Sequence, residues 1–357
     1  MKTGRLPLDK RITYLDILRV MATMLVIMVH APIARYAEYG ETPNVIYPIY
    51  ITLITIGSKM FFMVSGALLL PVQLPWKEFV RRRLRFVVTP LALWSGLYLL
   101  YRVFTGIFSV KQLISLPFFP IDTSLWFVYV MIVFYVFMPV LSRCLEAVGK
   151  RGVQVYLVLW MLSSFIPYQH GMFMQWGEFS HNMFSSFSGY LGYVVMGYYL
   201  HHWPLPLSDK RWRWGLIAFS LMAIVALPLF EFTVQEHFGL TYADHLATVT
   251  YDISINTIAM GILLFTLAQR FTPPRYAQGS QAGLSPAVEK VAVCSYGIYL
   301  CNILLLRLVI WPVTRPWLSS FHWTVDGAVC IVLCAAVSYV FIRGIYHTPF
   351  SKYIIGR

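Results

Sequence analysis

The chain has 357 residues, of which 58% are hydrophobic and 12% are charged, and its formal net charge is +13. Soluble domains carry about 25% charged residues, so this composition excludes an ordinary soluble enzyme and indicates a multi-pass membrane protein. The positive charge needs no nucleic acid as a partner, because basic loops beside anionic lipid headgroups account for it. The five cysteines form no C-x-x-C pair and predict neither a disulfide framework nor a metal site.

A helix that crosses a membrane needs about 20 mostly apolar residues, and the chain contains about ten such segments. We therefore predict one all-α transmembrane domain over residues 1–357, a bundle of about ten helices. The predicted spans lie near residues 14–36, 46–70, 86–106, 123–143, 152–168, 184–202, 214–233, 248–268, 290–312 and 323–343. Most of the 28 lysines and arginines fall on the side of the N-terminus, which places both termini in the cytoplasm by the positive-inside rule.

The first predicted span, YLDILRVMATMLVIMVHAPI, carries Asp16, Arg19 and His30. Arg19 and His30 are eleven residues apart, so they share one helix face, roughly 16 Å apart along the axis. Ionisable side chains are costly in a bilayer and usually mark a site or a pathway. Asp16 is three residues before Arg19 and is expected to pair with it. Neutral imidazole can take a proton from a hydroxyl at physiological pH, so His30 is a candidate general base.

Basic residues also mark the next two spans. Lys59 lies in the middle of the second span, where a lysine needs an anionic partner or ligand to keep its charge. The segment RRRLR at the start of the third span supplies Arg81, Arg82, Arg83 and Arg85. A guanidinium group can bind two phosphate oxygens at once, so the cluster is a candidate phosphate site on the cytosolic side. A basic anchor that only sets the orientation of the helix is the alternative interpretation.

Six segments along the chain form a recognisable series: YLDILR followed by His30, KMFFMVSGALLL, RRRLR with a proline after it, SLWFVYVMIVFYVFMPVL, GYVVMGYYL and SYGIYLCNILL. This series resembles the membrane-bound acyltransferase-3 family, bacterial multi-pass enzymes that O-acylate extracytoplasmic sugars. The likeness runs from about Tyr14 to the tenth span. It implies a stand-alone member, because the chain is too short for the hydrolase-like domain fused to some relatives.

The resemblance implies roles for individual residues. His30 matches the essential histidine of the family, Arg19 matches the arginine eleven residues before it, and Asp16 matches the acidic residue of the LDILR element. Lys59 stands where a basic residue often precedes the FFM-x-SG motif. The cytosolic arginines of the family are matched by one or more of Arg81, Arg82, Arg83 and Arg85.

Two positions depart from the family pattern. Ser124 and Asn302 stand where relatives often carry histidines, so His30 is expected to act without a second-histidine proton relay. Asn302 can still donate and accept hydrogen bonds. Together with Lys59 and Ser65, it is a candidate for stabilising the oxyanion or aligning the acceptor.

The implied function is an O-acyltransferase, most commonly an O-acetyltransferase, in the bacterial inner membrane. Cytosolic acyl-CoA is the donor substrate, with no tightly bound cofactor, and its phosphates would dock on the arginine cluster and Arg19. His30 would either deprotonate a sugar hydroxyl or carry the acyl group itself, and the sequence leaves both routes open. The acceptor is a cell-surface polysaccharide or a lipid-linked sugar. Membrane lipids and other exopolysaccharide or cell-envelope synthesis proteins are the remaining expected partners.

Two other classes of function are compatible with parts of the sequence. A secondary transporter or lipid-linked sugar flippase would use Arg19, His30 and Lys59 as proton-relay or substrate groups. The lack of a sequence repeat and of carboxylates deep in the predicted spans counts against it. A non-catalytic subunit of a polysaccharide synthesis complex is favoured only by the missing second histidine.

Overall fold

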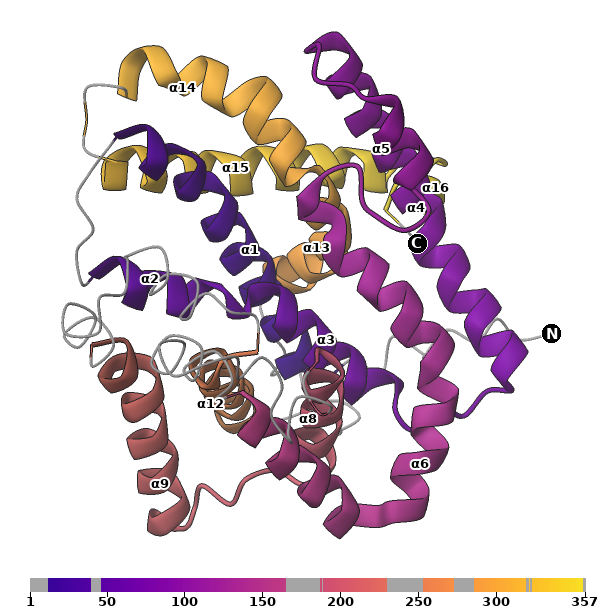
Figure 1. Ribbon diagram of the computed structural model, residues 1–357, viewed down its shortest axis with the longest axis vertical. Coiled ribbons are helices and arrows are strands. Elements are labelled where there is room, and N and C mark those ends of the chain that lie inside the picture. The colour runs from indigo at the N-terminus through magenta and orange to yellow at the C-terminus, as the bar shows by residue number, and fades with distance from the viewer. Residues whose placement is uncertain are drawn as a thin grey trace, which may run out of the picture. The chain divides into compact units, whose positions relative to one another are not determined.

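The computed structural model describes residues 12–39, 46–164, 187, 189–229, 253–272, 286–318, 321 and 323–355 (Figure 1). These residues form helices joined by turns and contain no strand, which confirms the predicted all-α membrane bundle. The helices are α1 (Thr13–Tyr39), α2 (Ile46–Ile54), α3 (Ile56–Leu69), α4 (Trp76–Phe104), α5 (Val110–Ser115), α6 (Trp126–Ser163), α8 (Leu191–His202), α9 (Lys210–Leu221), α12 (Ile255–Phe271), α13 (Pro286–Leu305), α14 (Trp311–Leu318), α15 (Trp323–Tyr346) and α16 (Ser351–Ile354). Shorter turns are the 3-10 turn η2 (Thr123–Leu125) and the π-helical turns η5 (Met222–Ala226) and η6 (Leu306–Ile310).

Seven helical segments of the described chain are long and apolar enough to cross a membrane. They are Thr13–Ala31, Ile49–Leu69, Trp76–Phe104, Thr123–Ser163, Lys210–Leu229, Val288–Leu318 and Thr324–Tyr346. The predicted span 184–202 contains the shorter helix α8, and the predicted span 248–268 overlaps α12, which ends at Phe271. Parts of both spans lie outside the described residues, as do 165–168 and 230–233. Prediction and structure therefore agree on apolar helices, while the predicted count of ten stays a prediction.

Two helices differ from the predicted spans in an instructive way. The predicted spans 123–143 and 152–168 fall on α6, which is interrupted at Gly149, where φ is 62°. Glycine adopts this left-handed conformation without a steric cost, so the chain turns there. Helix α4 begins at Trp76, ten residues before the predicted start at 86. Hydropathy marks the part of a helix that lipid covers, whereas the basic segment before it is helical as well.

The exposed face of α4 is apolar. Leu93, Leu97 and Leu100 follow one another at helical spacing, and their exposed fractions are 41%, 38% and 53%. In water such a stripe would be unfavourable, but in a bilayer it is the ordinary lipid-facing side of a helix. The same helix buries Trp94 and Tyr98 on its other side, so its two faces separate lipid from protein.

The described residues group into two compact units, and each is considered by itself. The first comprises Met1–Leu25, Thr42–Leu70 and Val148–Ala292, and the second comprises Val26–Glu41, Pro71–Ala147 and Val293–Arg357. In the first unit α3 packs closely on α8, with α12 against both. A Cβ atom added at Gly66 would lie 1.9 Å from the Val194 carbonyl oxygen, and one at Gly197 would lie 2.0 Å from that of Met63. Only glycine permits the two backbones to approach this far.

In the second unit α13 is hydrogen-bonded to α4. Tyr296 donates a hydrogen bond to the Val87 carbonyl oxygen (3.0 Å), and Tyr98 donates one to the Leu300 carbonyl oxygen (3.2 Å), so α4 and α13 are tied at two levels. The short helix α16 packs on α4, where the Trp94 indole donates to the Ile354 carbonyl oxygen. The two tyrosine hydrogen bonds hold α13 against α4, and α13 presents Asn302, a residue of the candidate site.

Candidate functional site

A long-range polar contact joins two of the predicted site residues, His30 on α1 and Asn302 on α13. Their Nδ1 and Oδ1 atoms are 2.9 Å apart, although the residues are 272 positions apart in the chain. Both belong to the second unit. The amide group of Asn302 is 1% exposed and is fixed from its other end, because its Nδ2 donates to the carbonyl oxygens of Ile298 and Tyr299.

This arrangement assigns the tautomer of the histidine. Because Nδ2 of Asn302 is occupied as a donor, the atom that faces His30 is the amide oxygen, which can only accept. The proton of the neutral imidazole therefore sits on Nδ1, and the lone pair is on Nε2. A nitrogen with a free lone pair can accept a proton from a hydroxyl or attack a thioester carbon.

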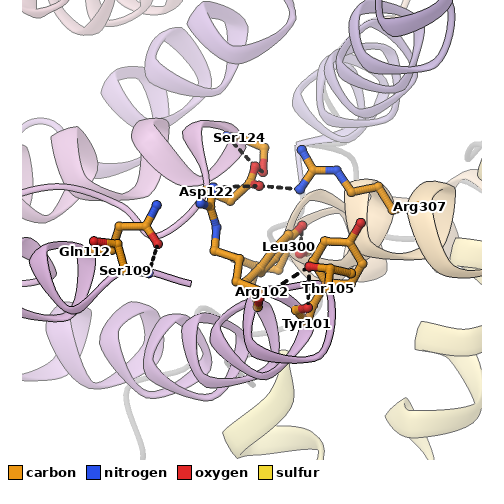
Figure 2. Close-up of polar contacts among 10 residues, drawn as sticks. Tyr101, Arg102, Thr105, Ser109, Gln112, Asp122, Ser124, Leu300 and Arg307 are labelled. Carbon is orange, nitrogen blue, oxygen red and sulfur yellow. Dashed lines mark hydrogen bonds and ion pairs between the residues drawn. The ribbon is translucent and has the colours of Figure 1, made fainter. Parts of the chain in front are cut away.

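A second polar cluster was not identified from the sequence. Asp122 lies directly before η2 and is 2% exposed. One carboxylate oxygen, Oδ1, accepts from the Ser124 backbone nitrogen (3.1 Å) and hydroxyl (2.8 Å). The other, Oδ2, lies 2.5 Å from Nη1 of Arg307 and 3.9 Å from Nη2 of Arg102. Figure 2 shows the carboxylate between the two guanidinium groups.

The charge of Asp122 follows from these contacts. Burial by itself raises the pKa of the carboxyl, but the hydrogen bond and charge of Arg307 and the two donors of Ser124 outweigh it. The net pKa is below the ordinary value, so Asp122 is an anion at neutral pH. A carboxylate that accepts from every side does not act as a base. Its role is to hold Arg102 and Arg307.

The same helix that fixes His30 also fixes this cluster. Tyr299 on α13 donates its hydroxyl proton to the Ser124 carbonyl oxygen and packs edge-on against the Phe127 ring, with centroids 5.5 Å apart. Arg307 follows in the π-helical turn η6, with the Tyr101 ring 5.8 Å from its guanidinium carbon. The charges of Asp122 and Arg307 act on the His30 ring. His30, Asn302 and the Asp122 cluster therefore form one candidate site within the second unit.

The four predicted phosphate-binding arginines lie on the first turns of α4. Arg82 forms an ion pair with Glu78, four residues before it, and the guanidinium carbon of Arg83 lies 5.7 Å from the centroid of the Phe79 ring. The side chains of Arg81 and Arg85 are exposed and lie on one face of the helix, because they are four residues apart. In the described part of the chain neither has an acidic partner.

The remaining predicted site residues belong to the first unit. Asp16 and Arg19 form the expected pair on α1, with an oxygen-to-nitrogen distance of 3.2 Å. Lys59 is 3% exposed on α3, where its ammonium group donates to the Thr55 carbonyl oxygen at 2.9 Å. Ser65 is half-buried on the same helix.

A signal for the missed cluster was present in the sequence. Arg102, Asp122 and Arg307 lie at the non-cytosolic ends of three predicted spans, 86–106, 123–143 and 290–312. Among these three charges only Asp122 is acidic, which makes it a natural partner of the two arginines. Their pairing is a tertiary contact across 185 positions, so no periodicity in the sequence could have shown it.

Comparison with known proteins adds one match. The family model of the acyltransferase-3 type, described as an acyltransferase domain, matches residues 12–343. No match was found among the curated proteins or among the solved structures.

Proposed function

Because the chain belongs to the acyltransferase-3 family, it is a multi-pass membrane acyltransferase, and we propose that it is specifically an O-acetyltransferase. The donor is cytosolic acetyl-CoA, and the acceptor is a hydroxyl of a cell-surface polysaccharide or lipid-linked sugar. The cell membrane in question is the bacterial inner membrane, with both termini cytoplasmic. Other envelope-synthesis proteins would supply or receive the sugar.

The observation that carries this proposal is the hydrogen bond from His30 Nδ1 to Asn302 Oδ1. It leaves Nε2 as the reactive nitrogen, in the manner of a histidine oriented by a hydrogen-bond acceptor behind it. Asn302 in place of the second histidine that relatives often carry is thus consistent with activity. An amide accepts the Nδ1 proton, and the family's relay is not needed to orient the ring.

Nε2 has two routes to acyl transfer. In the first it takes the hydroxyl proton while the sugar oxygen attacks the thioester carbon, and the CoA thiolate leaves. In the second Nε2 attacks the thioester carbon and expels the CoA thiolate. The sugar oxygen then attacks the acyl group, the N–C bond breaks, and the freed Nε2 accepts the hydroxyl proton. Brief incubation with donor alone separates them, because only the second route leaves an acetyl group on His30, visible by mass spectrometry.

Donor binding is assigned to the arginine cluster on α4. Arg81 and Arg85 present exposed guanidinium groups on the cytosolic side, and CoA carries a pyrophosphate and a 3′-phosphate that such groups bind. Arg19 and Lys59 would make further contacts with the donor. Asp16 would orient Arg19, and Ser65 would help to orient the substrates.

The test is transfer of labelled acetyl from acetyl-CoA to membrane glycan in vesicles that contain the full chain. We expect His30→Ala to lower transfer by about 10³-fold, since general acid–base catalysis contributes roughly 10²–10⁴-fold. Asn302→Leu should lower it by about 10²-fold by releasing the ring, while the protein remains folded. His347→Ala, an exposed histidine in the turn after α15, is the matched control. Unchanged transfer by His30→Ala refutes the proposal.

A further inference from the structure

The Asp122 cluster holds more positive charge than it neutralises. Two guanidinium groups share one carboxylate, so Arg102, Arg307 and Asp122 together carry a net charge of +1. The carboxylate has no capacity left, because Ser124 occupies its other oxygen. An uncompensated cation that is largely enclosed by protein is unfavourable unless an anion joins it.

Both arginines keep donors for such an anion. Arg307 directs Nη1 to Asp122, and its other guanidinium donors make no hydrogen bond within the described residues. Its side chain is 28% exposed, so these donors remain accessible. The Nε of Arg102 is buried and has no hydrogen-bond partner among the residues that the structure describes. Buried donors are nearly always paired in native proteins, and an unpaired one calls for an explanation such as a ligand.

The position of the cluster distinguishes it from the proposed donor site. Arg102 is in the last turn of α4, and Arg81 and Arg85 are in its first turns, so the helix separates the two sets by most of its 29 residues. With the N-terminal end of α4 on the cytosolic side, Arg102 lies toward the outer face, where the acceptor is presented. The charges of Arg307 and Asp122 reach the His30 ring.

We propose that Arg102 and Arg307 form a subsite for an anionic group of the acceptor, either a sugar carboxylate or the phosphate of a lipid-linked sugar. This inference rests on the proposed acyl transfer. Asp122 acts as a positioning residue, since it holds both guanidinium groups before the acceptor arrives. Fixing long side chains in advance lowers the entropy lost on binding, and a guanidinium fork matches either oxyanion in shape.

The first test measures binding without any acyl transfer. The purified full chain in detergent is unfolded thermally with methyl β-glucuronide, with the neutral methyl β-glucoside, or with inorganic pyrophosphate. A ligand of the native state raises the unfolding temperature as its concentration rises. We expect a shift with the glucuronide, with pyrophosphate or with both, and none with the glucoside. A shift with the glucuronide alone identifies a sugar carboxylate, and one with pyrophosphate alone identifies a lipid-linked phosphate.

Variants assign the shift to the subsite. Arg307→Gln should abolish the shift with the glucuronide, and in the Arg81→Gln/Arg85→Gln background it should also abolish the shift with pyrophosphate. Arg307→Lys, which keeps the charge but loses the fork, should leave a smaller shift. Arg315→Gln removes an exposed arginine eight residues later and should leave the shift intact. The double variant Arg81→Gln/Arg85→Gln lacks the proposed donor site, so the shift that it keeps with pyrophosphate belongs to the Arg102 and Arg307 subsite. The inference is overturned if the parent protein shows no shift. It is also overturned if Arg307→Gln and Arg307→Lys show the same shift as the parent.

The second test uses transfer kinetics with charged and neutral acceptors. Arg307→Gln should raise KM for the anionic acceptor about tenfold, the weight of one charge-assisted hydrogen bond, and leave KM for acetyl-CoA unchanged. An equal fall in kcat for both acceptors would place Arg307 at the oxyanion and contradict the subsite. Anion-dependent stabilisation without transfer would support the subsite while the proposed function fails. Acyl transfer without a preference for anionic acceptors would support the proposed function and contradict the subsite.

Discussion

Helix α4 carries arginines at both ends, and the two ends are built differently. At the first turns the contacts are local: Arg82 pairs with Glu78 one helical turn away, Arg83 stacks near Phe79, and Arg81 and Arg85 are exposed. At the last turn Arg102 is held by Asp122, a residue of the connection to α6 that also binds Arg307 beyond α13.

The difference separates two ways of meeting a charged ligand. Exposed arginines on one helix face can adjust to a large, flexible donor and cost the fold little, since surface charges contribute little to stability. Arginines held by a buried carboxylate cannot adjust, and the fold depends on them. The first arrangement suits capture of CoA phosphates, and the second suits exact placement of an acceptor beside His30.

The largest expected effect concerns the C-terminal end of α4, where Asp122 holds Arg102. Asp122→Asn removes the charge that holds both arginines and leaves two guanidinium groups without a counterion. We expect a loss of about 3 kcal/mol in the free energy of unfolding, the low end for breaking a buried ion pair. Thermal unfolding of the purified protein measures it. An unfolding temperature equal to that of the parent would mean that the carboxylate does not hold the fold.

The next effect tests the N-terminal end of α4. Arg81→Gln and Arg85→Gln should each raise KM for acetyl-CoA about tenfold, because each removes a charge-assisted hydrogen bond to phosphate. Their unfolding temperatures should not change. Arg82→Gln should raise KM less, since its guanidinium is already paired with Glu78. A dephospho-CoA thioester lacks the 3′-phosphate. The variant of the arginine that binds this phosphate should therefore have the same KM for that donor as the parent protein.

A smaller effect concerns the Glu78 pair. Glu78→Gln should change the free energy of unfolding by about 0.5 kcal/mol or less, as expected of an exposed pair at i,i+4 spacing. Measured beside Asp122→Asn, this variant sets the scale for the comparison between the two ends. If the two losses were equal, the ends of α4 would not differ in the way described.

The smallest effect is a response to acid. The pKa of Asp122 is lower in the folded protein than in the unfolded chain, so its stabilising contribution is fully present above the unfolded value of about 3.9. It is lost only as the pH falls below that value toward the folded pKa. Between pH 7 and 5 the difference in unfolding temperature between parent and Asp122→Asn should therefore be constant, and below about pH 4 it should shrink.

The sequence predicted the helices because a bilayer demands them. Long apolar segments must be helical in lipid, so the spans could be placed by length alone. The start of α4 at Trp76 escaped this rule, because its first turns carry Arg81 to Arg85 and look like a loop by hydropathy. The sequence predicts the turn inside α6 only as the gap between the spans 123–143 and 152–168, where Gly149 stands among charged residues.

The candidate site was accessible in part. His30 and Asn302 were singled out from the sequence, but the orientation of the amide depends on Ile298 and Tyr299, which become its acceptors only in the folded helix. The sequence pattern assigns no role to Arg102 or Arg307. Their partner Asp122 lies in a connection without periodicity, so only the tertiary structure reveals the cluster.

The close approach of α3 and α8 has a consequence for mutational tolerance. Saturation mutagenesis should find that Gly66 and Gly197 accept no other residue, because even alanine would collide with a backbone carbonyl that cannot move aside. Gly96 and Gly215 meet nothing within 4 Å and should accept alanine freely. The four glycines would look alike in a sequence, yet two fix the register of a helix pair and two are open to substitution.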